Sequence, residues 1–390
     1  MATYYVSQAT GDDASGDGSS GNPYASISKP FYLIGNSTAA HEIIIMDSET
    51  YLVANATFSG GSIVDDSVNQ IISTSGYLVR NLHLRAASGQ RPILDGQNSA
   101  TFAVKYFSSG VSMFHIEGIE FRNFTTNAFL STSGDRPIKV TGCTIKNIGA
   151  DAIQGRGSGS IIERCVLHNI TGYGFFGFRA ATIKNCLFFD IGRGAILFTA
   201  GGSGDGVVEH NTFFNCGDTR NGSSAVPYVI HASAPIRYNV LTSNSASIAG
   251  IRAVNNDNKY NLVFDTKSTS SPFGNVDNFY SGHGAGTGAL QVDPLLVSTQ
   301  SSGFESTSSA YDFNLGPGSP AQNAAVDSTR SLFLTSGSNW YVTGSRTWEY
   351  THEVIGVISS SHNDLGALEN SATILGVKTE NVASVTAVDD

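Results

Sequence analysis

The chain has 390 residues, a formal net charge of −10 and only 14% charged residues, against about 25% in an average globular protein. Its 43 glycines and 40% hydrophobic residues exclude a coiled coil and a charged disordered chain. The acidic balance argues against nucleic acid or anionic membranes as general partners. No window approaches about 18 consecutive apolar residues, so we expect no membrane insertion.

Residues 1–37 form the predicted entry to the fold. The start, MATYYVSQATGDD, has neither a basic region nor an apolar stretch, so the sequence predicts no secretory signal. In the loop that follows, Asp12, Asp13 and Asp17 lack the full spacing and the terminal glutamate of a calcium-binding loop. Residues 26–37, SISKPFYLIGNS, are expected to cap the first coil.

Short apolar segments recur through the middle of the chain. After a first copy at 79–86, the fourth position of each segment returns every 21 to 28 residues from residue 119 onward. At about 3.3 Å per residue, one such repeat spans roughly 70–80 Å, which suits one turn of a β-solenoid. A propeller blade would need about 40–45 residues. The fourth positions are Leu82, Ile119, Cys143, Cys165, Cys186, Asn211, Asn239 and Asn261.

Alternation along each segment places its first and sixth residues inside the coil, and the eighth is a polar turn residue. The turn column comprises Asn123, Asn147, Asn169, Asp190 and Asn215. This pattern resembles the right-handed parallel β-helix superfamily that includes pectate lyases, whose coils carry a similar asparagine ladder. The resemblance implies an all-β, single-stranded right-handed parallel β-helix of roughly ten coils at 38–310, an exit region at 311–370 and a tail at 371–390. Function stays open, because this fold also carries hydrolases, isomerases and adhesins.

The cysteines share one side of the coil. Cys143, Cys165 and Cys186 stack in one column and Cys216 lies five residues further along its own repeat. A linear column offers neither the paired spacing of a zinc site nor the roughly 90° torsion of a disulfide. The sequence therefore predicts buried free thiols, no metal site and no cofactor.

Two outward columns carry charge. One runs through Arg80, Glu117, Thr141, Glu163, Lys184, Glu209, Arg237 and Lys259 and alternates in sign from Glu163 to Arg237, which predicts a structural ladder of ion pairs. The other contains candidate glycan-binding residues, since cations pair with uronate or sulfate groups and aromatic rings stack on sugars. They are Arg85, Arg122, Lys146, His168, Phe189 and Phe214. The alternative is a solvated stripe whose aromatic residues are covered by a loop.

A third outward column is apolar. Its candidate interface residues are Leu130, Phe176, Phe178, Leu197 and Ile230. An exposed apolar row indicates a covered surface, for which a packed loop, a partner subunit and a long ligand are candidates. A likeness to trimeric β-helical phage spikes favours a homotrimer or contact with other virion proteins. Cover by the loop at 218–227 is the alternative, and a one-residue register error would turn the row inward.

The tail at 371–390 resembles Val/Ala/Ile-rich segments at the ends of phage structural proteins, and its alternation suits strand addition to a partner. Together with the apolar column it favours a virion-surface structural or adhesion protein, of tail-spike, fibre or capsid-surface type, that binds host-surface polysaccharide. The alternative is a polysaccharide lyase or glycoside hydrolase, although no clustered carboxylate pair assigns catalytic residues. A secreted extracellular protein is a further alternative for its location.

Overall fold

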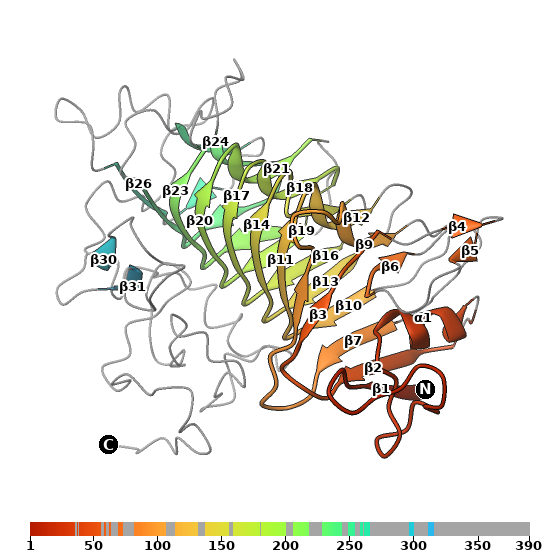
Figure 1. The fold of residues 1–390 in the computed structure, drawn as a ribbon. Coiled ribbons are helices and arrows are strands. Elements are labelled where there is room, and N and C mark those ends of the chain that lie inside the picture. The colour runs from red at the N-terminus through yellow and green to blue at the C-terminus, as the bar shows by residue number, and fades with distance from the viewer. Residues whose placement is uncertain are drawn as a thin grey trace, which may run out of the picture.

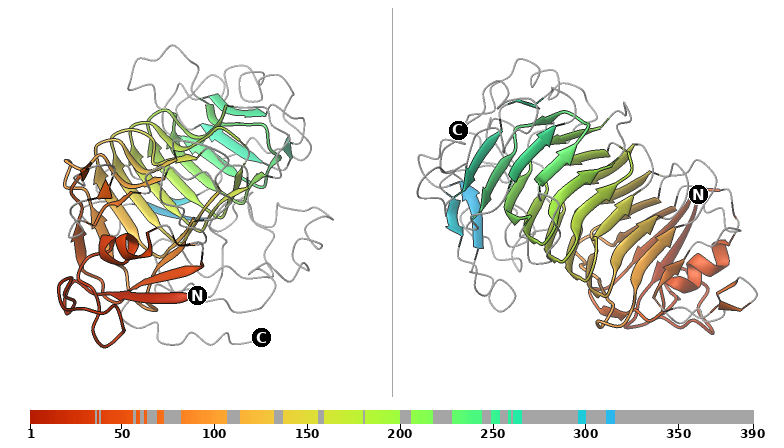
Figure 2. Two further views of the ribbon diagram at one scale, coloured as in Figure 1. Left: turned by 90° about the vertical axis from the view of Figure 1, so that its right-hand side faces the viewer. Right: turned by 90° about the horizontal axis from the view of Figure 1, so that it is seen from above.

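The computed structural model describes residues 1–265, together with 296–299 and 311–315. Within 1–265 it leaves out 36, 38, 56–57, 60–61, 64–68, 73–81, 107–113, 132–136, 156–158, 180, 200–205, 218–227, 244–248, 254–257 and 260. Short strands wind into a solenoid with three parallel sheets of ten, nine and eight strands (Figures 1 and 2). The predicted tail and most of the exit region, from residue 316 on, lie outside the described residues.

The strands of each sheet follow one another at intervals of about one turn. The first sheet contains β1 (Ala2–Val6), β2 (His41–Ile45), β7 (Leu82–Ala86), β10 (Phe114–Glu117), β13 (Ile138–Thr141), β16 (Ser160–Glu163), β19 (Ala181–Lys184), β22 (Val207–Glu209), β25 (Ile236–Arg237) and β28 (Asn258–Lys259). The second contains β3 (Thr50–Leu52), β8 (Ile93–Asp95), β11 (Glu120–Phe124), β14 (Thr144–Ile148), β17 (Val166–Ile170), β20 (Leu187–Ile191), β23 (Thr212–Cys216), β26 (Val240–Ser243) and β29 (Leu262–Asp265).

The third sheet contains β6 (Ile71–Ile72), β9 (Phe102–Tyr106), β12 (Asn127–Ser131), β15 (Ile153–Gly155), β18 (Tyr173–Gly177), β21 (Gly194–Phe198), β24 (Tyr228–Ala232) and β27 (Ala249–Ala253). Two antiparallel pairs stand apart, β4 (Phe58–Ser59) with β5 (Ser62–Ile63) and β30 (Leu296–Thr299) with β31 (Tyr311–Leu315). The all-β parallel solenoid predicted from the repeats is confirmed. About five regular three-strand turns, from β10 to β24, stack in succession, fewer than the roughly ten expected.

The core is built from columns of like residues, because in-register parallel pairing brings equivalent positions of successive turns together. On the first sheet, Ile116, Val140, Ile162, Ile183 and Val208 pair in register and are fully buried. Aromatic rings do the same on the second sheet, where Phe188 stacks on Phe213 with centroids 5.0 Å apart. The inward columns predicted from residue 116 onward are confirmed.

The first repeat has a different register from the one predicted. Leu84, not a residue five positions earlier, pairs with Ile116, and Arg85 pairs with Glu117. Arg85 therefore takes the place in the charged column that was expected for Arg80, which lies outside the described residues. The repeat from Leu84 to Ile116 spans 32 residues, against 21 to 25 between the corresponding residues from Ile116 to Val208, so the regular period gives no guide to its register.

The turn after the second-sheet strands carries the predicted asparagine ladder. Asn123, Asn147 and Asn169 have φ of 61°, 56° and 52°, a left-handed conformation that asparagine tolerates better than most residues. Asn147 Nδ2 donates to Asn123 Oδ1 at 3.0 Å, and Asn169 Nδ2 donates to Asn147 Oδ1 at 2.6 Å. The amides thus link successive turns as well as stabilise each turn.

Helix α1 (Ser28–Ile34) lies across the N-terminal end of the solenoid (Figure 1). Its residues Phe31 and Ile34, with Ile27 just before it, are buried in the same hydrophobic core as the first strands. In the preceding loop, the Asp12 and Asp13 carboxylates accept hydrogen bonds from the loop's own backbone. No helix among the described residues is long and apolar enough to cross a lipid bilayer.

Candidate functional site

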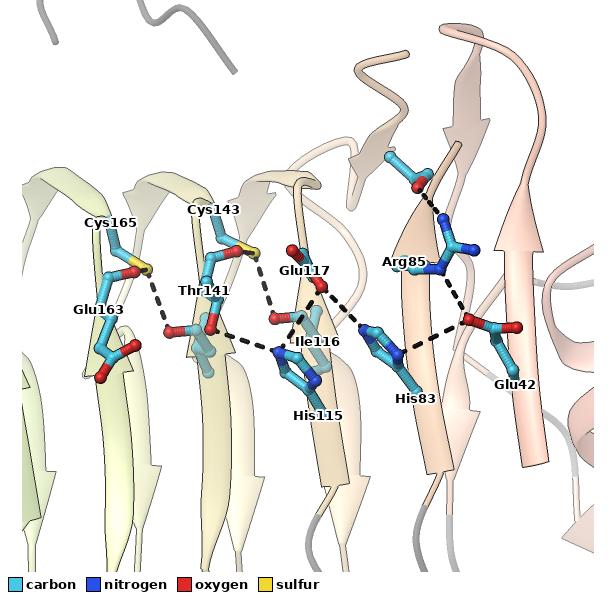
Figure 3. Close-up of polar contacts among 12 residues, drawn as sticks. Glu42, His83, Arg85, His115, Ile116, Glu117, Thr141, Cys143, Glu163 and Cys165 are labelled. Carbon is cyan, nitrogen blue, oxygen red and sulfur yellow. Dashed lines mark hydrogen bonds and ion pairs between the residues drawn. The ribbon is translucent and has the colours of Figure 1, made fainter. Parts of the chain in front are cut away.

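Two histidines and a glutamate come together on the outer face of the first sheet. His83 of β7 and His115 of β10 are in-register neighbours on adjacent strands. Their rings stack with centroids 4.1 Å apart and planes 6° apart. Glu117 lies two residues after His115 on the same strand, so it points to the same side of the sheet. Figure 3 shows all three side chains on one side of the two strands.

The three side chains are in polar contact. His83 Nε2 lies 3.0 Å from Glu117 Oε2, and His115 Nε2 lies 3.9 Å from the same oxygen. One nitrogen or oxygen atom from each residue lies within 4.8 Å of the others. The side chains of His83, His115 and Glu117 are 28%, 22% and 29% exposed, so the cluster is accessible from solvent while its atoms stay partly desolvated.

Neighbouring strands support this cluster from both sides (Figure 3). On β2, Glu42 Oε1 lies 3.8 Å from His83 Nδ1 and accepts a hydrogen bond from Arg85 Nε at 2.7 Å. On β13, Thr141 Oγ1 lies 3.3 Å from His115 Nε2. The cluster is therefore one part of a polar row that crosses four strands of a regular sheet.

His115 and Glu117 both have a pKa below its ordinary value. Burial, with the nearby His83 and Lys139, lowers the pKa of His115 to about 3. The hydrogen bond from His83 lowers the pKa of Glu117, outweighing the effect of its burial. At neutral pH the row thus offers an uncharged imidazole beside a carboxylate, and both can donate electron pairs to a cation.

This cluster was not predicted from the sequence. The assumed alignment placed His83 five positions away from its true register, so His83 and His115 did not fall in one column. The signal that could have found them is local, since the tripeptides at 83–85 and 115–117 both begin with histidine and end with a charged residue. Aligning the two tripeptides reproduces the observed pairing.

Comparison with known proteins agrees with the geometry of the coils. The family model described as a right handed beta helix region matches residues 104–266. This segment is a right-handed parallel β-helix. No curated protein sequence matches the chain.

Two solved structures resemble the β-helix at low similarity. The pectate lyase Pel9A aligns with 95% of this chain and 97% of its own, at 15% identity and a TM-score of 0.42. The GH136 lacto-N-biosidase from Eubacterium ramulus aligns with 75% of this chain and 67% of its own, at 10% identity and a TM-score of 0.36. Neither similarity carries information about the activity of this β-helix.

The predicted basic column is divided between two sheets of the β-helix. Arg85 lies on the first sheet, so its placement beside Arg122 was wrong. Arg122 and Lys146 lie outward on β11 and β14 of the second sheet as expected. Arg122 Nε contacts Asp95 Oδ2 at 2.8 Å, and Lys146 Nζ contacts Glu120 Oε1 at 3.3 Å. Both cations remain about one quarter exposed.

The other predicted glycan-binding residues are buried. His168, Phe189 and Phe214 follow Lys146 in register, but they are only 3%, 1% and 2% exposed. His168 stacks on Phe189 with centroids 4.5 Å apart. The expectation that they form an exposed surface was wrong, because the outer face of the second sheet is covered at β17, β20 and β23, where nearly every residue is buried.

The apolar column on the third sheet is partly exposed, with one exception. Leu130, Phe176 and Leu197 stand in one register row, with Gln154 between the first two, and Phe178 lies beside them. All are partly exposed. Ile230 is fully buried because it pairs with the inward Ile196, and His231 takes the outward position instead. The assignment of Ile230 to the outer face was therefore wrong by one residue.

The charged column forms the predicted ion-pair ladder over the stretch from Lys184 to Arg237. Glu209 is 2% exposed, and its carboxylate lies between Lys184 Nζ at 2.9 Å and Arg237 Nε at 3.0 Å. These three residues come from three successive strands, β19, β22 and β25. The ladder joins turns across the outer face of the first sheet and is structural.

Proposed function

We propose that this protein is a virion-surface attachment protein that assembles as a homotrimer through the third sheet of its β-helix and binds host-surface polysaccharide. The observation that carries the proposal is the row of Leu130, Phe176 and Leu197, which lie outward on a regular sheet and remain partly exposed. Polar side chains normally occupy such positions, whereas apolar ones indicate a surface that another molecule covers.

Neighbouring aromatic side chains extend the apolar row. Phe176 also contacts Tyr173 and Phe178, with ring centroids 5.8 and 5.2 Å apart. Burying one large apolar side chain stabilises by roughly 1.5–3 kcal/mol. A three-fold axis parallel to the β-helix would bring three copies of the row together and bury all of them at once.

The assembly is tested with Phe176→Glu and Leu197→Glu in one chain, sized by light scattering. We expect an oligomeric wild type and a monomeric double variant whose circular dichroism is unchanged. Thr182→Glu, an outward residue of the first sheet, is the matched control and should leave the oligomer intact. A monomeric wild type would reject the proposed assembly.

Polysaccharide binding is proposed at Arg122 and Lys146. They lie side by side on adjacent strands, and each is held by a carboxylate. Guanidinium and ammonium groups pair with uronate or sulfate groups of acidic glycans. Binding to acidic polysaccharides, measured by affinity electrophoresis, should be weakened by Arg122→Gln with Lys146→Gln and unaffected by the matched variant Lys139→Gln. Equal binding by both variants would exclude this surface.

The virion location is supported by the sequence of residues 371–390 together with the apolar row. If it is correct, mass spectrometry of purified virus particles will find this chain in stoichiometric amounts. Its presence in the culture medium without particles would favour a secreted protein instead.

A polysaccharide-cleaving enzyme is a second candidate, and the cluster of His83, His115 and Glu117 favours it. Lyases need a base and a nearby cation that pairs with the uronate carboxylate. His83, in contact with Glu117, is the candidate base, and Lys139 is the in-register neighbour of His115. Ultraviolet absorbance of unsaturated uronates, followed over a panel of acidic polysaccharides, tests this function. Product formed by the wild type and abolished by His83→Asn would establish it.

A further inference from the structure

We propose that His83, His115 and Glu117 bind one divalent first-row transition-metal ion, such as Zn²⁺, on the outer face of the first sheet. The site spans the two adjacent strands β7 and β10. It goes beyond the proposed attachment function, which requires no metal ion.

The donor atoms are close to the spacing that a metal ion imposes. Zinc binds imidazole nitrogen and carboxylate oxygen at about 2.0–2.2 Å, so the ligands of a tetrahedral ion lie roughly 3.3 Å apart. Glu117 Oε2 lies 3.0 Å from His83 Nε2 and 3.9 Å from His115 Nε2. To bind one ion, both rings would have to turn out of their parallel stack so that their Nε2 lone pairs converge on it.

The backbone fixes the positions of all three donors. His83 and His115 are paired in register between two strands, and His115 and Glu117 are two residues apart on one strand. Both strands are paired on their far sides as well, with β2 and β13. A site held by the middle strands of a sheet is more rigid than one held by loops, which favours binding without rearrangement of the chain.

The surroundings supply the support that a metal-bound histidine needs. His83 must present an unprotonated Nε2 to the ion, which leaves its proton on Nδ1. That atom faces Glu42 Oε1 at 3.8 Å, and Arg85 and Thr3 hold the Glu42 carboxylate through hydrogen bonds of 2.7 and 3.3 Å. A carboxylate behind a ligating histidine is a common feature of protein metal sites, because it fixes the tautomer and the ring orientation.

The donor set also selects the class of ion. Calcium and magnesium prefer oxygen ligands throughout, whereas two imidazoles with one carboxylate suit zinc, cobalt, nickel or iron(II). Three protein ligands leave at least one coordination position open. Lys139, beside His115 on β13, adds a positive charge that disfavours a cation, so we expect affinity below that of a closed structural zinc site.

The test is calorimetric titration of the full chain with Zn²⁺, repeated with Co²⁺ while visible absorption is recorded. We expect one ion per chain and the d–d bands of a low-coordinate Co²⁺ ion. Glu117→Gln and His83→Gln should each weaken binding by more than about 10-fold, and Glu42→Gln by about 10-fold through the supporting contact. The matched control is Glu163→Gln, which removes a carboxylate two strands further along the same outward column and should leave binding unchanged.

Two results would overturn the proposal. One is a wild-type chain that binds no Zn²⁺ at the concentrations of the titration. The other is equal binding by the wild type, Glu117→Gln and His83→Gln, which would indicate adventitious binding elsewhere. Circular dichroism confirms that each variant is folded, and Glu117→Gln is nearly isosteric, so a loss of binding with an unchanged spectrum supports the site. The light-scattering and glycan-binding tests of the attachment function are carried out without metal, so their outcomes do not depend on the outcome of the metal titration.

Discussion

Cys186 and Asn211 occupy the same position on adjacent turns, and the backbone N–H of Cys186 donates a hydrogen bond to Asn211 Oδ1 at 2.9 Å. Each side chain also donates to a backbone carbonyl of the turn before it. Cys186 Sγ donates to Ile162 O at 3.5 Å, and Asn211 Nδ2 donates to Ile183 O at 2.9 Å. The column thus changes from thiol to amide between these turns while its geometry is kept.

The amide half of this column should contribute more stability than the thiol half. Asn239 is fully buried, and its Oδ1 accepts from the Asn211 backbone N–H at 3.0 Å. Asn239→Ala leaves that donor unsatisfied, at a cost of about 1–3 kcal/mol. Cys165→Ala, on an equally buried residue, removes only a weak donor and should cost less. Urea unfolding measures both, and a larger loss in Cys165→Ala would contradict the assignment.

The four cysteines are free and buried, so we predict that they do not react in the folded chain. Burial raises the pKa of the thiols of Cys143, Cys165 and Cys216, and the thiolate is the reactive form. A thiol reagent should label none of the four in native buffer and all four in denaturant. Rapid labelling of the native protein would show that the column is open to solvent.

The asparagine ladder combines a backbone effect and a side-chain effect, which two substitutions at Asn147 separate. Asn147→Ala loses the amide hydrogen bonds. It also keeps a Cβ in the left-handed conformation at φ 56° without the side-chain hydrogen bonds that offset its strain, which costs about 1–2 kcal/mol. Asn147→Gly loses the same hydrogen bonds but is relaxed at this φ. We therefore expect the alanine variant to be less stable than the glycine variant in thermal unfolding. Equal stabilities would mean that the backbone contribution is negligible.

The ion-pair ladder predicts a loss of stability in acid. Burial alone would raise the pKa of Glu209, but Lys184 and Arg237 outweigh it and hold the pKa below its usual range. In the unfolded chain Glu209 takes up its proton at a higher pH, so its stabilising contribution is present above about pH 4.5 and is lost as the pH falls toward the lowered folded pKa. Denaturant unfolding between pH 7 and pH 3 should show this loss in the wild type.

Glu209→Gln serves as the comparison for that prediction. It should be less stable than the wild type at pH 7, because Lys184 and Arg237 lose a buried partner, and the difference should shrink in acid. If the stability difference between the wild type and Glu209→Gln stayed constant from pH 7 to pH 3, the assigned role of the Glu209 carboxylate would be contradicted.

His168 should also make stability depend on pH, over a higher range. Burial, helped by Lys146, lowers its pKa to about 3. The unfolded chain binds this proton below about pH 6.5, so the stability that neutral His168 provides is complete above that pH and declines as the pH falls toward 3. His168→Phe keeps a ring against Phe189 and should reduce the stability loss between pH 6.5 and pH 4. An NMR titration in which the His168 ring protonates near pH 6 would reject the lowered pKa.

Several parts of the structure could be predicted because they depend on local pattern alone. Residues such as Ile116, Val140 and Ile162 recur at the spacing of one turn, and alternation requires that they face the core. The stacked asparagines and cysteines follow from the same repeat. The prediction failed where the repeat length changed, before β10 and before β24. There Arg85 and Ile230 were misplaced, since two neighbouring apolar residues such as Val229 and Ile230 give no local indication of which one faces inward.

The sequence by itself determined the solenoid, its inward columns, its polar turns and its free thiols, since each depends on periodicity and on which residue types tolerate burial or a left-handed turn. Only the tertiary structure decided which of the outward-pointing residues are exposed to solvent. His168 and Phe189 alternate outward as predicted yet are buried, because burial depends on what packs over a sheet and not on the strand's own pattern. His83 and His115 meet because strand register joins residues 32 positions apart, and register is a property of the paired backbones that neither segment specifies alone.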